Sequence, residues 1–124
     1  MPAIHDVRVA LARLAREHSV PLFGFASIGA GPTLIGDASV LSYPSLVQRL
    51  FSSADDIDRL RAQLRHLGSP RIYSQGETAA IFGLLTNGLI YGLFVDSSRS
   101  AVEQFRLASS IHAALTSVGG PESV

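Results

Sequence analysis

The most apolar stretch of the chain is the run from Ala79 to Val95, and it contains a turn of its own. Asn87 followed by Gly88 supplies the positive φ angles that a two-residue type I′ hairpin loop requires. The run is therefore predicted to form two antiparallel strands. Both faces of this hairpin are apolar, whereas a hairpin with one wet face would alternate apolar and polar residues. We therefore expect it in the middle of a sheet with helices on both sides.

A two-residue turn also sets the register of this hairpin, and it places Gly83 opposite Gly92. Gly24 in an earlier strand would extend the same bare patch of backbone. Interior glycines weaken a strand, so the patch requires a reason. Either a helix packs closely on it or a small-molecule cavity lies over it. The last helix has small residues suited to close packing: Ala108, Ser109, Ala113 and Ala114.

Apolar residues at helical spacing predict helices at 4–18, at 42–67 and from about residue 100 to 117. Ser52 and Ser53 leave open whether the second helix is continuous. The predicted buried stripe of its second part is Ile57, Leu60, Leu64 and Leu67. The predicted buried stripe of the last helix is Val102, Phe105, Ala108, Ile111, His112 and Leu115.

The remaining strands are predicted at 22–28, 33–39 and 70–75. The first is apolar on both faces and therefore central, while the polar content of the other two favours the edges of the sheet. The only arrangement that keeps both hairpins intact is then the strand order 2-1-5-4-3. We expect an α+β fold with a five-stranded antiparallel sheet, the first and last helices on one face and the middle helix on the other. With 124 residues, the chain is expected to form one domain, 1–124, with an ordered core of about 4–117.

Composition narrows the classes of protein. The chain has no Cys and no net charge, so a disulfide framework and a nucleic-acid partner are not expected. Charges near the N-terminus interrupt any signal peptide, and no segment predicts membrane insertion, which favours a cytoplasmic location. Yet hydrophobic residues make up 47% of the chain, charged residues only 16%, and the mean hydropathy is +0.29. Some apolar surface is therefore expected to be buried against a partner.

No motif for catalysis, cofactor binding or metal binding is present. None of the four His residues has a second His or Glu at metal-ligand spacing. The loop Gly29-Ala30-Gly31-Pro32 lacks the Lys-Ser/Thr of a P-loop, and no G-x-S-x-G elbow occurs. The chain is not expected to be an enzyme.

With this order of elements, the chain resembles the Roadblock/LC7 family of profilin-like domains. The resemblance lies in the order and length of the elements from Ile4 to Ser117, in F-G-F-A-S-I-G-A-G-P-T-L-I-G-D-A-S, and in the apolar hairpin followed by A-V-E-Q-F-R-L-A-S-S-I-H-A-A-L. The turn Gly-Ala-Gly-Pro and the potential helix break depart from the family pattern. They leave a GAF-like or PAS-like small-molecule sensor as the alternative, although a PAS domain lacks the leading helix.

The resemblance implies a homodimer and a bacterial, non-catalytic regulator or scaffold that binds a small Ras-like GTPase. It implies dimerisation through the third strand and the middle helix. The expected dimer-interface residues on that strand are Arg71, Ile72, Tyr73 and Ser74. Residues on the exposed side of the middle helix, chosen by helical spacing, are expected to bind the partner. They are Arg49, Asp56, Arg59, Gln63 and His66.

Overall fold

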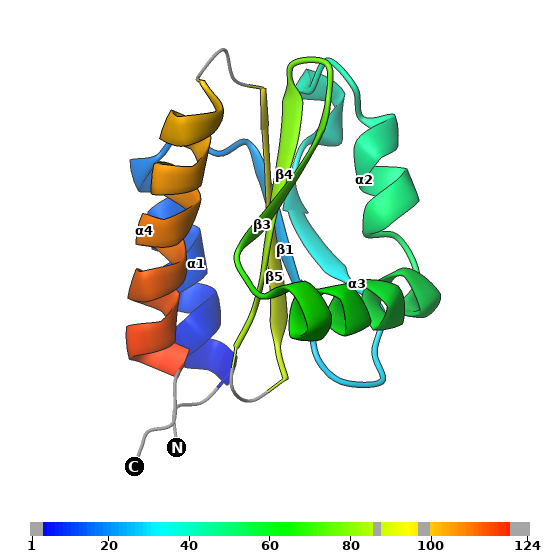
Figure 1. Ribbon diagram of the computed structural model, residues 1–124, viewed down its shortest axis with the longest axis vertical. Helices are drawn as coiled ribbons and strands as arrows, with labels where there is room; N and C mark the ends of the chain where they lie inside the picture. The colour runs from blue at the N-terminus through cyan, green and yellow to red at the C-terminus, as the bar shows by residue number, and fades with distance from the viewer. Residues whose placement is uncertain (1–3, 86–87, 97–99, 120–124) are drawn as a thin grey trace.

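The computed structural model describes residues 4–85, 88–96 and 100–119, which form a sheet between two layers of helices (Figure 1). The elements, in chain order, are α1 (Ile4–Glu17), β1 (Leu22–Ala26), β2 (Thr33–Gly36), the short 3-10 helix η1 (Ala38–Val40), α2 (Ser45–Leu50), α3 (Ala54–Leu67), β3 (Arg71–Gln75), β4 (Thr78–Leu84), β5 (Ile90–Asp96) and α4 (Ala101–Gly119).

The sheet has the order β2-β1-β5-β4-β3, and every neighbouring pair is antiparallel. Helices α1 and α4 cover one face, and α2 and α3 cover the other (Figure 1). The predicted fold class, strand order and placement of the helices are therefore confirmed. None of the described helices is long and apolar enough to cross a membrane.

The predicted register of the β4–β5 hairpin is wrong by one residue. Gly83 is opposite Tyr91, and Gly92 is opposite Phe82. The connection is longer than a two-residue turn, because the Leu85 N–H donates to the Leu89 carbonyl at 2.9 Å. The expected turn residue Asn87 lies outside the described residues. Because side chains alternate between the two faces of a sheet, a shift of one residue places each side chain of β5 on the opposite face relative to β4 from the one predicted.

Aromatic rings, rather than a helix or a small molecule, fill the glycine patch. Gly24 and Gly92 are cross-strand partners, but Gly83 does not belong to their row. A Cβ atom on Gly24 would lie 2.9 Å from the ring of Phe51, and one on Gly92 would lie 2.9 Å from the ring of Phe82. These two rings pack with their centroids 5.5 Å apart. The expected packing of the small residues of α4 on this patch is therefore wrong, since α4 lies on the opposite face.

The middle helix is broken, and the break places Phe51 in the core. Phe51 follows α2, is fully buried, and also packs against Phe94 with the ring centroids 5.9 Å apart. The chain then starts α3 after Ser53, whose hydroxyl accepts a hydrogen bond from the Asp56 N–H at 3.1 Å. With the break, the side chains of Phe51 and Ile57 both lie in the buried cluster beneath α2 and α3.

Three residues of the predicted buried stripes are exposed. Leu67 is 53% exposed because it is the last residue of α3, where the helix leaves the sheet. On α4, Val102 is 60% and Phe105 is 56% exposed, because Ala108, Ile111 and Leu115 set the buried side of the helix and the first turns point away from it. Helix α4 starts with a capping box, in which the Ser100 N–H donates to the Glu103 carboxylate at 3.0 Å and the Glu103 N–H donates to the Ser100 hydroxyl at 3.2 Å.

Tyr91 connects the sheet to α4. Its ring is fully buried and lies against Gly83, where an added Cβ would come within 2.3 Å of the ring. Its hydroxyl lies 2.7 Å from Nδ1 of His112 on α4. Burial raises the pKa of the Tyr91 hydroxyl and lowers the pKa of the His112 imidazole. The neutral Tyr–His pair is therefore the form that the fold favours.

Gly83→Ala is expected to destabilise the protein by about 1–3 kcal/mol, because the new methyl group must displace the Tyr91 ring and with it the contact to His112. The matched control is Gly31→Ala, since a Cβ there meets nothing closer than 3.8 Å. Urea denaturation of both variants measures the free energy of unfolding. Equal stability of the Gly83→Ala variant and the parent would contradict this packing.

The lowered pKa of His112 predicts a loss of stability in mild acid. The unfolded chain takes up the His112 proton near pH 6.5, whereas the folded chain takes it up only at lower pH. The contribution of His112 is thus complete above pH 6.5 and is lost as the pH falls below it. We expect the free energy of unfolding to fall less between pH 7 and 5 in a His112→Gln variant than in the parent. Identical pH dependence in the two proteins would rule this out.

Candidate partner-binding surface

Strand β3 is an edge of the sheet, and its side chains alternate between the two helix layers. Ile72 packs against the cluster beneath α1 and α4, and Tyr73 packs against the cluster beneath α2 and α3. Ser74 is exposed. Among the described residues, only β4 pairs with β3, so the outer row of backbone N–H and C=O groups of Arg71–Gln75 has no strand beside it. Such a row is a template for pairing with another strand.

Two side-chain hydrogen bonds join this edge strand to the helices. The Tyr73 hydroxyl donates to Oε1 of Gln63 on α3. The Arg49 guanidinium at the end of α2 donates to Oε1 of Gln75 at 2.8 Å. Tyr73, predicted for dimerisation, and Gln63, predicted for partner binding, are therefore in direct contact. We call this region the α3–β3 surface; it consists of Arg49, Arg59, Gln63, Arg65, His66 and Arg71–Gln75.

Asp56, one of the predicted partner-binding residues, is occupied within the fold. Its carboxylate accepts hydrogen bonds from the Ser52 N–H at 3.0 Å, from the Ser52 hydroxyl at 2.9 Å and from the Ser53 N–H at 3.2 Å. Partial burial opposes ionisation of this carboxyl group, but the hydrogen bonds from the two serines outweigh it and lower its pKa. Asp56 therefore caps the start of α3, and its carboxylate is already hydrogen-bonded within the chain.

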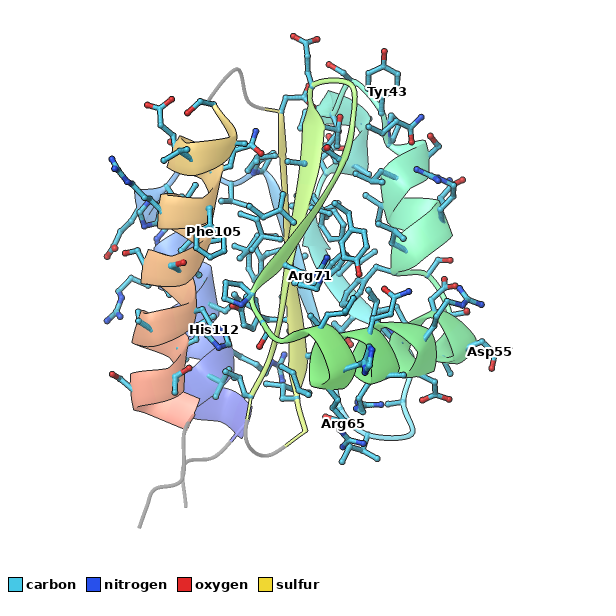
Figure 2. All side chains as sticks on the ribbon, in the orientation of Figure 1. Tyr43, Asp55, Arg65, Arg71, Phe105 and His112 are labelled. Carbon is cyan, nitrogen blue, oxygen red and sulfur yellow. The ribbon has the colours of Figure 1, made fainter. Side chains whose placement is uncertain are left out.

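Arg49, Arg59 and His66 are the exposed members of the predicted partner-binding set. The Arg59 side chain is 63% exposed and its Nη1 lies 3.2 Å from Oδ1 of Asp56. Arg65, which was not singled out in the sequence, is exposed on the same helix, and Figure 2 shows it and Asp55 pointing away from the sheet. Helical spacing alone would have found Arg65, because it lies outside the buried stripe as the other exposed residues do.

Arg61 is a buried cation that sequence reasoning missed. It is 7% exposed, and its Nη2 donates to the Gly88 carbonyl at 3.1 Å while its Nη1 lies 3.5 Å from Asp58. Its Nε has no hydrogen-bond partner among the described residues. The position lies four residues after Ile57, on the buried side of α3, and that spacing was the available signal. Arg61 ties α3 to the end of the β4–β5 hairpin.

Asp96 organises the opposite end of the sheet. It accepts hydrogen bonds from the Ser42 hydroxyl and from the Thr78 hydroxyl, each at 2.6 Å, and from the Ser42 N–H at 2.8 Å. These hydrogen bonds, that from the Ser42 hydroxyl first, lower the pKa of the Asp96 carboxyl group. Both hydroxyls donate to the same carboxylate. This cluster therefore anchors the segment before α2 to β4 and β5.

Within the part of the chain that the structure describes, no three His, Asp or Glu residues come together in a group that would hold a metal ion.

Comparison with solved structures shows which known fold this chain has. No protein-family model matches the chain, and no curated protein matches it in sequence. Among solved structures, Myxococcus xanthus MglB matches with a TM-score of 0.60 and 9% sequence identity, over 93% of this chain and 95% of that chain. The chain thus has a Roadblock/LC7-like fold, as the order of its elements predicted. At this identity the likeness concerns the fold alone.

Because the Asp56 carboxylate is hydrogen-bonded to Ser52 and Ser53, replacing Asp56 should mainly lower the stability of the fold. Asp56→Ala is expected to lower the free energy of unfolding by about 1 kcal/mol through loss of the cap. Asp55→Ala is the matched control, because Asp55 is exposed and lies in the same first turn. We expect a much smaller loss there, of about 0.3 kcal/mol, from the helix dipole alone. Chemical denaturation of both variants measures the difference, and equal losses would contradict the capping role.

Proposed function

We propose that this chain is a non-catalytic regulatory or scaffold protein of the cytoplasm, which forms a homodimer and binds a small Ras-like GTPase. The observation that carries the proposal is the joining of the free β3 edge to the exposed side of α3 through the Tyr73–Gln63 and Arg49–Gln75 hydrogen bonds. Pairing of two copies at β3 would bring their two α3–β3 surfaces together. The kind of partner comes from the resemblance to Roadblock/LC7 domains, with which the fold agrees.

Apolar surface beside β3 supports the homodimer. Phe105 lies seven residues before His112, so both are on the same side of α4, as Figure 2 shows. His112 reaches Tyr91, whose ring lies over Gly83 of β4, the strand next to β3. Helix α4 also lies against β3, so this exposed phenyl group is on a helix that borders the free edge of the sheet. A second copy paired at β3 would satisfy the backbone groups and cover this apolar side chain as well.

Exposed cations on α3 support a protein partner. Arg59 and Arg65 are exposed, and His66 lies beside them on the same helix. Arg is enriched at interface hot spots because its planar guanidinium forms several hydrogen bonds at once. These residues are held in place by an α-helix that is capped at Ser53 and packed on the sheet through Ile57. A rigid helix that presents exposed guanidinium groups suits a protein surface with hydrogen-bond acceptors.

The small-molecule sensor has less support. The place considered for its ligand is the bare backbone at Gly24, Gly83 and Gly92. The rings of Phe51 and Phe82 occupy it at Gly24 and Gly92, and the ring of Tyr91 occupies it at Gly83. A ligand there would have to displace a fully buried phenyl group from the core.

A charge at the β3 edge is expected to prevent dimerisation. Ser74→Lys places two like charges close together when β3 pairs with its twin, so the dimer dissociation constant should rise at least about tenfold. Thr33→Lys is the matched control, because Thr33 is an exposed residue of the opposite edge strand. Light scattering at micromolar concentration measures the mass. A monomeric parent, or a dimer insensitive to Ser74→Lys, would contradict the β3 interface.

A reversed charge on α3 is expected to abolish partner binding while leaving the dimer intact. Arg59→Glu places a repulsive charge in the contact, and Arg59→Gln separates that repulsion from the loss of the ion pair to Asp56. Arg13→Glu on α1 is a control at an equally exposed position. The measurement is a pull-down with small GTPases from the source cell. Retention of the GTPase by Arg59→Glu at parental affinity would move the site off α3.

A further inference from the structure

The opposite edge of the sheet, β2, is more open than β3. All four residues of β2 are exposed, whereas three of the first four residues of β3 are partly buried. Leu34 is 40% exposed and Ile35 is 42% exposed, and they point to opposite faces because side chains alternate along a strand. The strand reads Thr-Leu-Ile-Gly and contains neither charge nor proline. Natural edge strands often carry such features to prevent pairing, whereas the one such feature of β2 in the described structure is its short length of four residues.

What covers this edge must be an extended chain. Only β1 pairs with β2 among the described residues, so the outer backbone groups of Thr33–Gly36 remain to be matched. A helix cannot supply alternating donors and acceptors along a strand, but another strand can. Such a strand would also place one apolar side chain beside Leu34 on one face and another beside Ile35 on the other. An extended segment with apolar residues at neighbouring positions meets both needs.

Charge identifies one more property of that segment. The guanidinium of Arg8 on α1 lies 4.9 Å from the centre of the Phe25 ring, and Phe25 is the cross-strand partner of Thr33. Arg8 therefore lies over the sheet on the same face as Ile35, next to β2. Arg8 is exposed and, like Arg16, Arg49, Arg65, Arg71 and Arg106, forms no ion pair among the described residues. Because it lies beside β2, an acidic residue on an added strand could pair with it.

We propose that β2 is a docking strand for an extended segment of another protein, which extends the sheet beyond β2 and places an acidic side chain beside Arg8. The site is independent of the proposed GTPase partner and of the β3 dimer. In a dimer formed through β3, the two β2 strands lie at the outer ends of the joined sheet and remain accessible.

The test is a selection of phage-displayed random nonapeptides on the immobilised full chain. The enriched peptides are then synthesised with a fluorescein label and measured by anisotropy. We expect them to share neighbouring apolar residues and an acidic residue. Arg8→Glu should weaken their binding at least about tenfold, and Arg16→Glu, at an exposed position of the same helix, should leave it unchanged. In a peptide that adds to β2 as a strand, every second N–H group faces β2. N-methylation of those residues should abolish binding, and N-methylation of the residues between them should leave it unchanged.

Three results would overturn the proposal. The first is the absence of any peptide enriched over the support alone. The second is binding that is insensitive both to Arg8→Glu and to N-methylation. The third is a change in self-association of the chain on Ile35→Lys, measured by sedimentation, because it would assign the β2 edge to a second copy. Thermal melts of Arg8→Glu and Ile35→Lys establish that each variant is folded before binding is compared.

Discussion

The register of the β4–β5 hairpin is the constraint on which the rest of the structure depends. In that register each large ring stands opposite a glycine: Tyr91 opposite Gly83 on the side of α1 and α4, and Phe82 opposite Gly92 on the side of α2 and α3. The missing side chains make room for the rings, and the rings restore the packing that the glycines lose. The interior is close-packed, so the space left at Gly24 must also be filled. The break between α2 and α3 places the Phe51 ring there, on the side of α2 and α3.

Much of the fold was predictable because it follows from polarity. Strands apolar on both faces must be central and more polar strands must be edges, and this gave the order of the sheet and the helix layers. The register was not predictable, because Asn87-Gly88 indicates a two-residue turn and a single extra residue reverses the faces. Exposure of the site residues was only partly predictable. Helical spacing found Arg59, but it could not show that Asp56 caps its own helix or that Gln63 binds Tyr73.

The two edge strands, β3 and β2, differ in how far their side chains are fixed by contacts with the helices. The side chains of β3 are tied to both helices on its side, through Gln63 and Arg49, so that a partner meets a fixed arrangement. The side chains of β2 are exposed, and Arg8 lies over Phe25 of the neighbouring strand β1. The first edge suits a symmetric contact between two folded copies. The second suits a flexible segment that becomes ordered as it binds, with backbone hydrogen bonds supplying most of the contact.

The central claim is that two copies pair at β3 and leave β2 free, and amide hydrogen exchange tests it most directly. Exchange is followed residue by residue in Arg71–Gln75 and in Thr33–Gly36 at high and at low protein concentration. The account predicts that outward-facing amides of β3 are protected in the concentrated sample and lose that protection on dilution, whereas those of β2 exchange quickly in both. Rapid exchange of the outer β3 amides at every concentration would contradict it.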